Sequence, residues 1–310
     1  MEFLNRFIGH QKRQTSNKTD EPLSHDQLSS IPEHSQGHLE PPQLVAGCAQ
    51  SVGRQREHNE DALLMLTTTL ASNQTNIPSG LYIVADGMGG HLYGEKASEV
   101  AVRTLAGHIL HKLYAPLLNP SPDFPNDTIQ EILYAGTQDA HRMIGKEAPG
   151  GGTTLTAAFI LGEQLTIAHV GDSRAYLISE DGTWQTLTRD HSVVRRMEEM
   201  GQLTAAEAAV HPQRNLLYRA LGQGEPFDPD ITTTHLPPSG YLLICSDGLW
   251  GVVPEKELKQ LITLTGQPHQ VCQDLVTAAN AAGGPDNISV ILVRLAGKAA
   301  EPNASEQNPE

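Results

Sequence analysis

Four short apolar runs in this chain each adjoin an aspartate, and this recurrence restricts the folds that the chain can adopt. Residues 81–85 lead into Asp86, residues 241–245 into Asp247, and residues 288–293 follow Asp286 almost directly. Residues 165–170 and 175–178 flank Asp172, a spacing typical of a hairpin with its turn at that aspartate. The pattern therefore predicts four strand ends that each present a carboxylate.

Three other segments carry the helical repeat, in which apolar residues recur every three or four positions. They cover residues 95–113, 128–146 and 270–282. Residues 190–224 lack a strong strand signal and look like a helical insertion over the strand ends. This mixture of strands and helices predicts an α+β or layered α/β body.

Both ends of the chain are polar. Residues 10–43 are rich in Gln, Ser, His, Asn, Glu and Pro, and residues 297–310 have a similar composition. Such segments bury too little apolar surface to offset the entropy lost on ordering, so we expect a disordered tail over 1–43 and another over 297–310. The folded body should then be a single domain over 44–296.

The bulk composition excludes some classes of protein. The formal net charge of -15 argues against nucleic-acid binding, which depends on Lys and Arg. Three widely spaced cysteines suggest no disulfide framework and favour a reducing compartment. Apolar runs fall short of the roughly 18 residues that a membrane span needs. We expect a cytoplasmic protein without a transmembrane segment.

The Asp86–Gly87 pair is the strongest candidate for a chemical site. An Asp-Gly pair alone is often a turn, and Asp181–Gly182 between two apolar stretches is interpreted as one. Asp86–Gly87 instead leads into Met88-Gly-Gly-His91, where glycine allows close approach of the backbone to an ion or phosphate. Carboxylates converging from several strands would hold two hard divalent ions, with an activated water between them.

Six motifs occur in order along the chain and together resemble one family. They are Gly53-x-x-Arg56-x-x-Asn59-Glu60-Asp61, Val84-Ala-Asp86-Gly-Met-Gly-Gly-His91 with Gly94-Glu95-x-Ala97-Ser98, Gly152-Thr-Thr154, His169-Val-Gly-Asp172-Ser-Arg174, Cys245-Ser-Asp247-Gly248 and Gly284-x-Asp286-Asn287. The chain resembles the protein phosphatase 2C family, the metal-dependent serine/threonine phosphatases, and specifically its bacterial branch. The resemblance spans about residues 45–295.

The resemblance implies a fold, an activity and a set of roles. The fold would be a four-layer α-β-β-α sandwich of two antiparallel sheets, with a flap at about 190–224. The activity would be hydrolysis of phosphoserine and phosphothreonine in proteins, with two or possibly three Mn²⁺ or Mg²⁺ ions. Arg56 would hold the substrate phosphate. The implied metal ligands are Asp86 and the carbonyl of Gly87, Asp247 and Asp286, Asp61 with Glu60 beside it, and Asp172 at a third, weaker site.

The chain departs from the animal branch of the family at one position. There a histidine follows the Asp-Gly pair and protonates the leaving group, whereas this chain has Met88. The general acid is then His91, His211 of the flap, or a metal-bound water, and these alternatives stay open.

Three other functions fit the sequence less well. A catalytically silent module that binds phosphoproteins would be expected to lack one of its metal carboxylates, and a two-metal nuclease is disfavoured by the acidic charge. Cys48 to Arg54 fits the Cys-x5-Arg pattern of thiol phosphatases, but the segment continues as loop or strand, so Cys48 is interpreted as a buried strand residue. As partners we expect phosphorylated proteins, including a serine/threonine kinase or its substrates, and we expect the chain to be a monomer.

Overall fold

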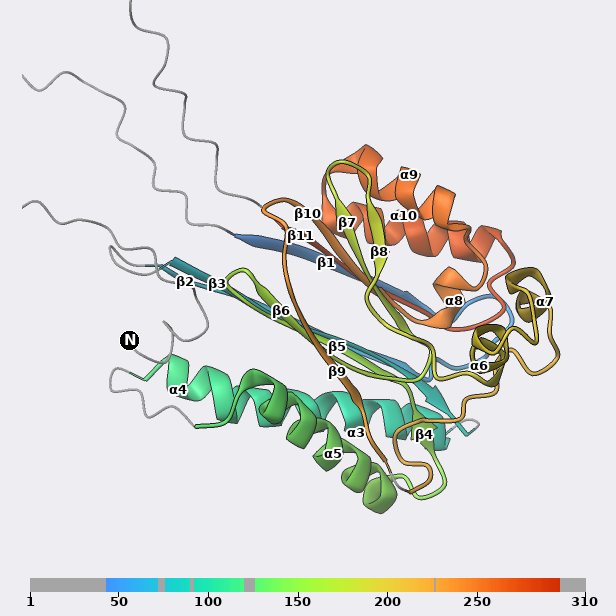
Figure 1. The fold of residues 1–310 in the computed structure, drawn as a ribbon, viewed down its shortest axis with the longest axis horizontal. Coiled ribbons are helices and arrows are strands. Elements are labelled where there is room, and N and C mark those ends of the chain that lie inside the picture. Colours follow the sequence, from blue (N-terminus) through green and yellow to red (C-terminus); the bar gives the residue numbers. More distant parts are fainter. Residues whose placement is uncertain (1–42, 72–75, 90–91, 120–125, 226, 296–310) are drawn as a thin grey trace, which may run out of the picture.

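Two antiparallel sheets lie face to face in the computed structural model, and helices cover their outer faces (Figure 1). The structure describes residues 43–71, 76–89, 92–119, 126–225 and 227–295. One sheet has the strand order β1-β11-β10-β7-β8, and the other has the order β2-β3-β5-β6-β9, with β4 paired to β3. This arrangement confirms the predicted sandwich of two sheets between helices.

The strands follow the predicted apolar runs and add others. Their bounds are β1 Leu44–Ser51, β2 Asp61–Ala71, β3 Asn76–Met88, β4 Gly152–Thr153, β5 Leu155–Leu161, β6 Gln164–Val170, β7 Arg174–Ser179, β8 Trp184–Thr186, β9 Asp230–His235, β10 Gly240–Cys245 and β11 Ile288–Leu295. The helices are α3 Leu92–Ile109, α4 Ala115–Leu117, α5 Ile129–Glu147, α6 Val193–Glu199, α7 Ala205–Ala209, α8 Asp247–Trp250, α9 Glu255–Thr265 and α10 Pro268–Ala281, with a π-helical turn, η1, at Leu110–Tyr114.

Side-chain alternation explains why the central strands are apolar along their whole length. In β3, Leu81 and Ile83 point to the helices, whereas Tyr82 and Val84 point to the opposite sheet. Successive side chains of a strand face opposite ways, and here both faces are covered. Each sheet therefore separates two apolar cores, and the four-layer order of the fold follows from this.

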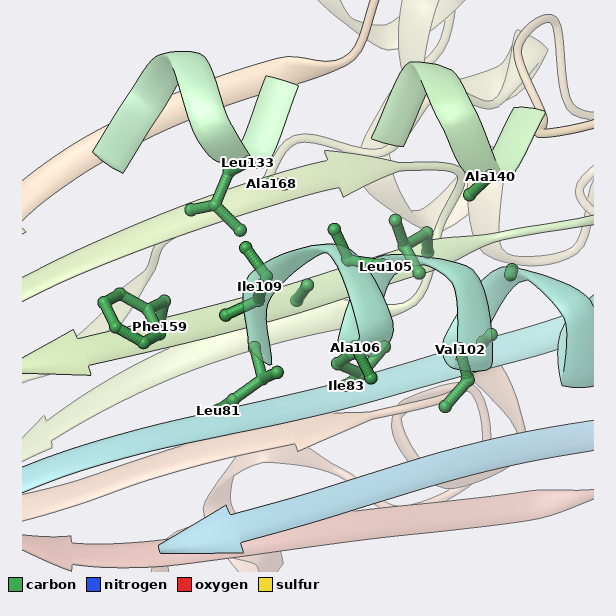
Figure 2. Close-up of a cluster of buried hydrophobic side chains, with 14 of the residues drawn as sticks. Leu81, Ile83, Val102, Leu105, Ala106, Ile109, Leu133, Ala140, Phe159 and Ala168 are labelled. Carbon is green, nitrogen blue, oxygen red and sulfur yellow. The ribbon is translucent and has the colours of Figure 1, made fainter. Parts of the chain in front are cut away.

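The outer core on the β3 side lies beneath α3 and α5 (Figure 2). Leu105 and Ile109 of α3 pack there with Leu133 of α5 and Phe159 of β5. The start of α5 is set by a capping box, in which the Thr128 hydroxyl accepts from the N–H of the residue three positions later. The opposite outer core packs α9 and α10 against the other sheet.

The structure confirms some of the expectations from the sequence and corrects others. The three predicted helices are present within a few residues, and Asp181–Gly182 forms a turn between β7 and β8. The predicted Asp172 hairpin is wrong: β6 and β7 flank Asp172, but β6 pairs with β5 and β9 in one sheet, whereas β7 pairs with β10 and β8 in the other. The expected tails lie outside the described residues, apart from residue 43. Cys48 lies in β1, but it is half-buried rather than buried because β1 is an edge strand. None of the described helices is both long and apolar enough to span a bilayer.

Candidate active site

Asp61 and Asp86 lie opposite each other at one end of their sheet. Asp61 begins β2 and pairs in register with Asp86 near the end of β3. One carboxylate oxygen of Asp61 accepts hydrogen bonds from the hydroxyls of Ser246 and Ser289, at 2.9 and 2.7 Å. Ser289 lies in β11 of the other sheet, and Ser246 directly follows β10 of that sheet. Asp61 therefore joins the two sheets at this end of the molecule.

The backbone at Asp86 is held from the neighbouring segment. Its N–H donates to the hydroxyl of Thr154 at 2.9 Å, and its carbonyl accepts from the Thr154 N–H at 2.8 Å. The next residue, Gly87, donates its N–H to the carbonyl of Glu60. A side chain at this position would collide with the carbonyls of Glu60 and Gly94, at 2.5 and 2.3 Å. Glycine is therefore required for β3 to approach the start of α3.

Asp247 and Asp286 come from the opposite sheet. Asp247 begins α8 directly after β10, and Asp286 precedes β11. One Asp286 oxygen accepts from the N–H of Asn287, and the other forms an ion pair with Arg56 at 2.7 Å. The Asn287 amide donates to the carbonyls of Val52 and His58, which fixes the loop that carries Arg56.

Burial and mutual repulsion dominate the electrostatics of this cluster. Burial, followed by the charges of neighbouring aspartates, raises the pKa of Asp61 to about 7 and that of Asp247 to about 6. The same causes raise the pKa of Asp86 and of Asp172 well above the ordinary value. Asp61 and Asp172 are buried, and Asp86 and Asp247 are half-buried. Four such carboxyl groups that disfavour one another's ionisation form a site that a multivalent cation would stabilise.

Two carboxylate oxygens support the same interpretation. Asp61 Oδ1 and Asp247 Oδ1 are buried without a hydrogen-bond partner within the described part of the chain. Unpartnered buried acceptors are costly in a folded protein, and oxygen donors are the ligands that Mg²⁺ and Mn²⁺ prefer. The residues therefore fit divalent cations. As the side chains stand, no three His, Cys, Asp or Glu among the described residues form a closed ligand set.

A cleft of about 460 Å³ opens beside the cluster. Asp172, Asp247 and Asp286 line it from the sheet ends, and Arg56 stands at its edge with half of its side chain exposed. Helices α6 and α7 of the predicted flap contribute the opposite wall. The cationic side chain of Arg56, three carboxylates and the flap helices thus surround the same cleft.

The remaining predicted residues have different positions. Glu60 directs a carboxylate oxygen toward Gly94 at the start of α3. His211 lies in the flap, where its Nδ1 accepts from the N–H of Gln213, and it is not among the described residues that line the cleft. His91 lies outside the described residues.

Sequence reasoning missed the hydroxyl and amide residues that hold the carboxylates. Ser289 was not considered, although a single serine inside the buried run 288–295 was a usable signal. Ser246, Thr154 and Asn287 stood in the quoted motifs without an assigned role. Their hydrogen bonds now show that they fix Asp61, Asp86 and the Arg56 loop.

Comparison with known proteins adds independent findings. The family model Protein phosphatase 2C matches residues 46–288. The chain is 37% identical over 246 residues to "Serine/threonine phosphatase stp" of Listeria monocytogenes, covering 78% of this chain and 92% of that protein. It is 35% identical over 258 residues to "Protein phosphatase PhpP" of Streptococcus pneumoniae, covering 81% and 97%.

Solved structures are similar as well. The S. agalactiae serine/threonine phosphatase superposes with a TM-score of 0.66 at 32% identity, covering 81% of this chain and 98% of that one. The catalytic domain of the phosphatase PstP, solved in complex with two manganese ions, gives a TM-score of 0.64 at 28% identity, covering 81% and 97%.

Proposed function

The chain belongs to the protein phosphatase 2C family, and on that premise we propose that its clustered aspartates form the catalytic centre. It is a metal-dependent serine/threonine protein phosphatase, so its substrates are phosphoproteins. The observation that carries the assignment of the site is the set of buried carboxyl groups with raised pKa values beside a cleft edged by Arg56.

We assign the cation-binding groups as follows. Asp86, the carbonyl of Gly87, Asp247 and Asp286 would hold one part of the centre, and Asp61 and Glu60 another. Asp172 would serve a further, weaker site at the cleft wall. The PstP relative contains two manganese ions, which supports Mn²⁺ for this chain, with Mg²⁺ as the alternative. When bound, such ions supply a nucleophilic water near neutral pH and neutralise charge on the phosphoryl oxygens.

The protein's own groups then orient the reaction. Water attacks phosphorus, the ester P–O bond breaks, and the serine or threonine oxygen leaves with a proton. Arg56 can direct its planar guanidinium at two phosphoryl oxygens once substrate competes with Asp286 for it. For the leaving proton we propose His91 or a water of the cleft rather than His211, because the His211 side chain does not line the cleft.

A pair of aspartate variants tests this assignment. Asp86→Ala removes a group at the centre of the cluster, whereas Asp181→Ala removes an exposed carboxylate of a plain turn. Hydrolysis of a phosphothreonine peptide in Mn²⁺ should fall at least about a thousandfold in Asp86→Ala, as expected when a group that organises the reacting charge is lost. It should be unchanged in Asp181→Ala and abolished by a chelator. Full activity in Asp86→Ala would refute the assignment.

Three further expectations belong to the same proposal. We propose that residues 44–296 form the catalytic domain with the flap at about 190–224, flanked by tails at 1–43 and 297–310. We propose that the chain acts as a monomer in the cytoplasm. Its substrates would include a serine/threonine kinase or the proteins which that kinase phosphorylates, which comparison of phosphoproteomes with and without the chain would test.

A further inference from the structure

The first residues of the flap meet the turn that carries Asp172. This turn, residues 171–173, joins β6 to β7 and is called the Asp172 turn below. His191 contacts it through two hydrogen bonds with one residue. The His191 N–H donates to the carbonyl of Gly171 at 2.7 Å, and the Gly171 N–H donates to His191 Nδ1 at 3.1 Å. The backbone and the imidazole of His191 therefore bind the two peptide groups that flank the Cα of Gly171.

A second set of contacts fixes the imidazole itself. Because Nδ1 accepts a hydrogen bond, the ring proton is on Nε2, which lies 3.1 Å from Asp230 Oδ2. Arg219 donates to the other oxygen of Asp230 at 2.8 Å. The His191 side chain is 2% exposed, and its burial lowers the pKa of His191, in agreement with a neutral imidazole. The tautomer and the ring plane are thus both determined.

The Asp172 turn has little freedom on its other sides. Gly171 has a φ of +104°, and a side chain there would meet Thr154 at 2.6 Å. The Thr154 hydroxyl lies 2.7 Å from that of Ser173, and the indole of Trp250 donates to the carbonyl of Asp172 at 3.0 Å. A change at His191 would therefore be transmitted to Asp172 rather than absorbed by a loose loop.

His191 also joins the two ends of the flap. Its carbonyl accepts from the N–H of Tyr218 at 2.9 Å, and Val193 donates to the carbonyl of Leu216 at 2.9 Å. The next residue, Ser192, forms a backbone bridge with Leu217. His191 thus contacts the closing segment of the flap through its backbone, and the Asp172 turn and β9 through its side chain.

We propose that His191 is a positioning residue that orients the Asp172 turn and so directs the Asp172 carboxylate into the cleft. The inference rests on the proposed function, in which Asp172 binds the weakest of the cations. His191 does not line the cleft among the described residues, so it acts through Gly171 and not on substrate. Partners of this kind, one step removed from a metal ligand, typically change metal affinity by about 10- to 100-fold when they are lost.

Two substitutions of His191 separate its two side-chain hydrogen bonds, which join it to Gly171 and to Asp230. His191→Asn places an amide oxygen near the position of Nδ1, so it can still accept from Gly171. His191→Gln reaches toward Asp230 but leaves the Gly171 N–H without its acceptor. His235, an exposed residue at the end of β9, provides the matched control as His235→Asn. The full chain is titrated with Mn²⁺ by calorimetry, and kcat and KM are measured with a phosphothreonine peptide.

The proposal expects a specific order of effects. His191→Gln should weaken the weakest Mn²⁺ site by about tenfold or more, His191→Asn by much less, and His235→Asn not at all. Equal metal titrations in all three proteins, with only the unfolding temperature lowered, would show a merely structural role and overturn the proposal. If His191→Gln does not fold, Asp230→Ala replaces it, because loss of the Nε2–H partner releases the tautomer and should weaken the same site.

An Asp172→Ala protein keeps this test distinct from that of the proposed function. Loss of the weakest Mn²⁺ site in Asp172→Ala, together with the same loss in His191→Gln, supports the positioning role. An unchanged titration in Asp172→Ala overturns it, while wild-type hydrolysis of the peptide and its loss in Asp86→Ala would still support the assigned centre.

Discussion

The carboxylate cluster and the flap lie on either side of one cleft, but they are built differently. The cluster draws on strand ends of both sheets, and its groups are buried or half-buried and fixed by hydrogen bonds from distant segments such as Ser289. The flap, residues 190–224, contains two short helices held mainly by local caps and by exposed ion pairs such as Arg195 with Glu198. Exposed ion pairs contribute little to stability.

The flap also exposes apolar side chains that the sheets bury. Met200, Val210, Leu216 and Tyr218 are among the large exposed hydrophobic residues of the described chain. The cluster is thus held by long-range hydrogen bonds, whereas the two flap helices are held by weaker local contacts. If that contrast is correct, changes in the cluster should abolish the reaction, and changes in the two flap helices should act locally.

The largest expected effect is a loss of activity that accompanies a gain of stability. Asp247→Asn removes one buried charge from a group of like charges while keeping its volume. Activity with Mn²⁺ should fall at least about a hundredfold, whereas the unfolding temperature in chelator should rise, because functional sites retain unfavourable charge. Thermal unfolding and peptide hydrolysis measure the two effects. If Asp247→Asn is less stable than wild type without metal, repulsion between the carboxylates does not dominate the cluster, and the contrast with the flap fails.

The second expectation concerns pH in the absence of metal. Asp61 and Asp247 have folded pKa values of about 7 and about 6, above the ordinary value of 3.8. At a pH between the ordinary pKa and the folded pKa of each group, the folded state binds more protons than the unfolded state. These two groups therefore stabilise the fold less as the pH rises from about 4 to about 7. His169, whose buried imidazole has its pKa lowered to about 4, acts in the opposite direction.

Comparison of wild type with Asp61→Asn isolates the contribution of the carboxylate. The unfolding temperature of wild type in chelator, measured from pH 5 to pH 8, should fall by several degrees relative to that of the variant. Saturating Mn²⁺ should remove this difference in slope, because bound cations favour the ionised carboxylates. Parallel curves without metal would contradict the electrostatic account.

Arg56 should have an intermediate effect, mainly on substrate binding. Arg56→Ala should raise KM by about tenfold or more and lower kcat less, because the side chain sits at the cleft edge, half exposed. Arg56→Lys keeps the charge but loses the two-pronged geometry, so it should recover only part of the loss. Steady-state kinetics with a phosphothreonine peptide distinguish these cases, and an unchanged KM in Arg56→Ala would exclude the phosphate-binding role.

The smallest effect is expected in the flap. Thr204 caps α7 and forms a capping box with Glu207. Thr204→Ala should cost about 1 kcal/mol of local stability and should leave the global unfolding temperature nearly unchanged. Hydrogen exchange or limited proteolysis of residues 200–212 measures the local loss. A large drop in the global unfolding temperature would show that the flap is integral to the fold. The flap would then resemble the cluster in its dependence on long-range contacts.

Much of the fold was predictable because strand ends and helix faces leave a local signal. The apolar runs beside Asp86, Asp247 and Asp286 indicated where the strands stop, and the six motifs indicated the family. The contacts that assemble the site were not predictable in the same way. Ser289 donates to Asp61 across 228 residues of chain, and His191 to Asp230 across a gap of 39 residues. Such pairings depend on how the two sheets are stacked, which no local pattern encodes.

The Asp172 turn has a mechanical consequence for the whole sandwich. Its strands belong to different sheets, with β6 in one and β7 in the other, and only residues 171–173 connect them. Four steps of extended chain reach about 14 Å, while stacked sheets lie about 10 Å apart, so this connection, which bends at Gly171, has little slack. It acts as a strap of fixed length at the active-site end. Lengthening it by one or two glycines would let the layers separate there, and would alter the spacing of the carboxylates without replacing any of them.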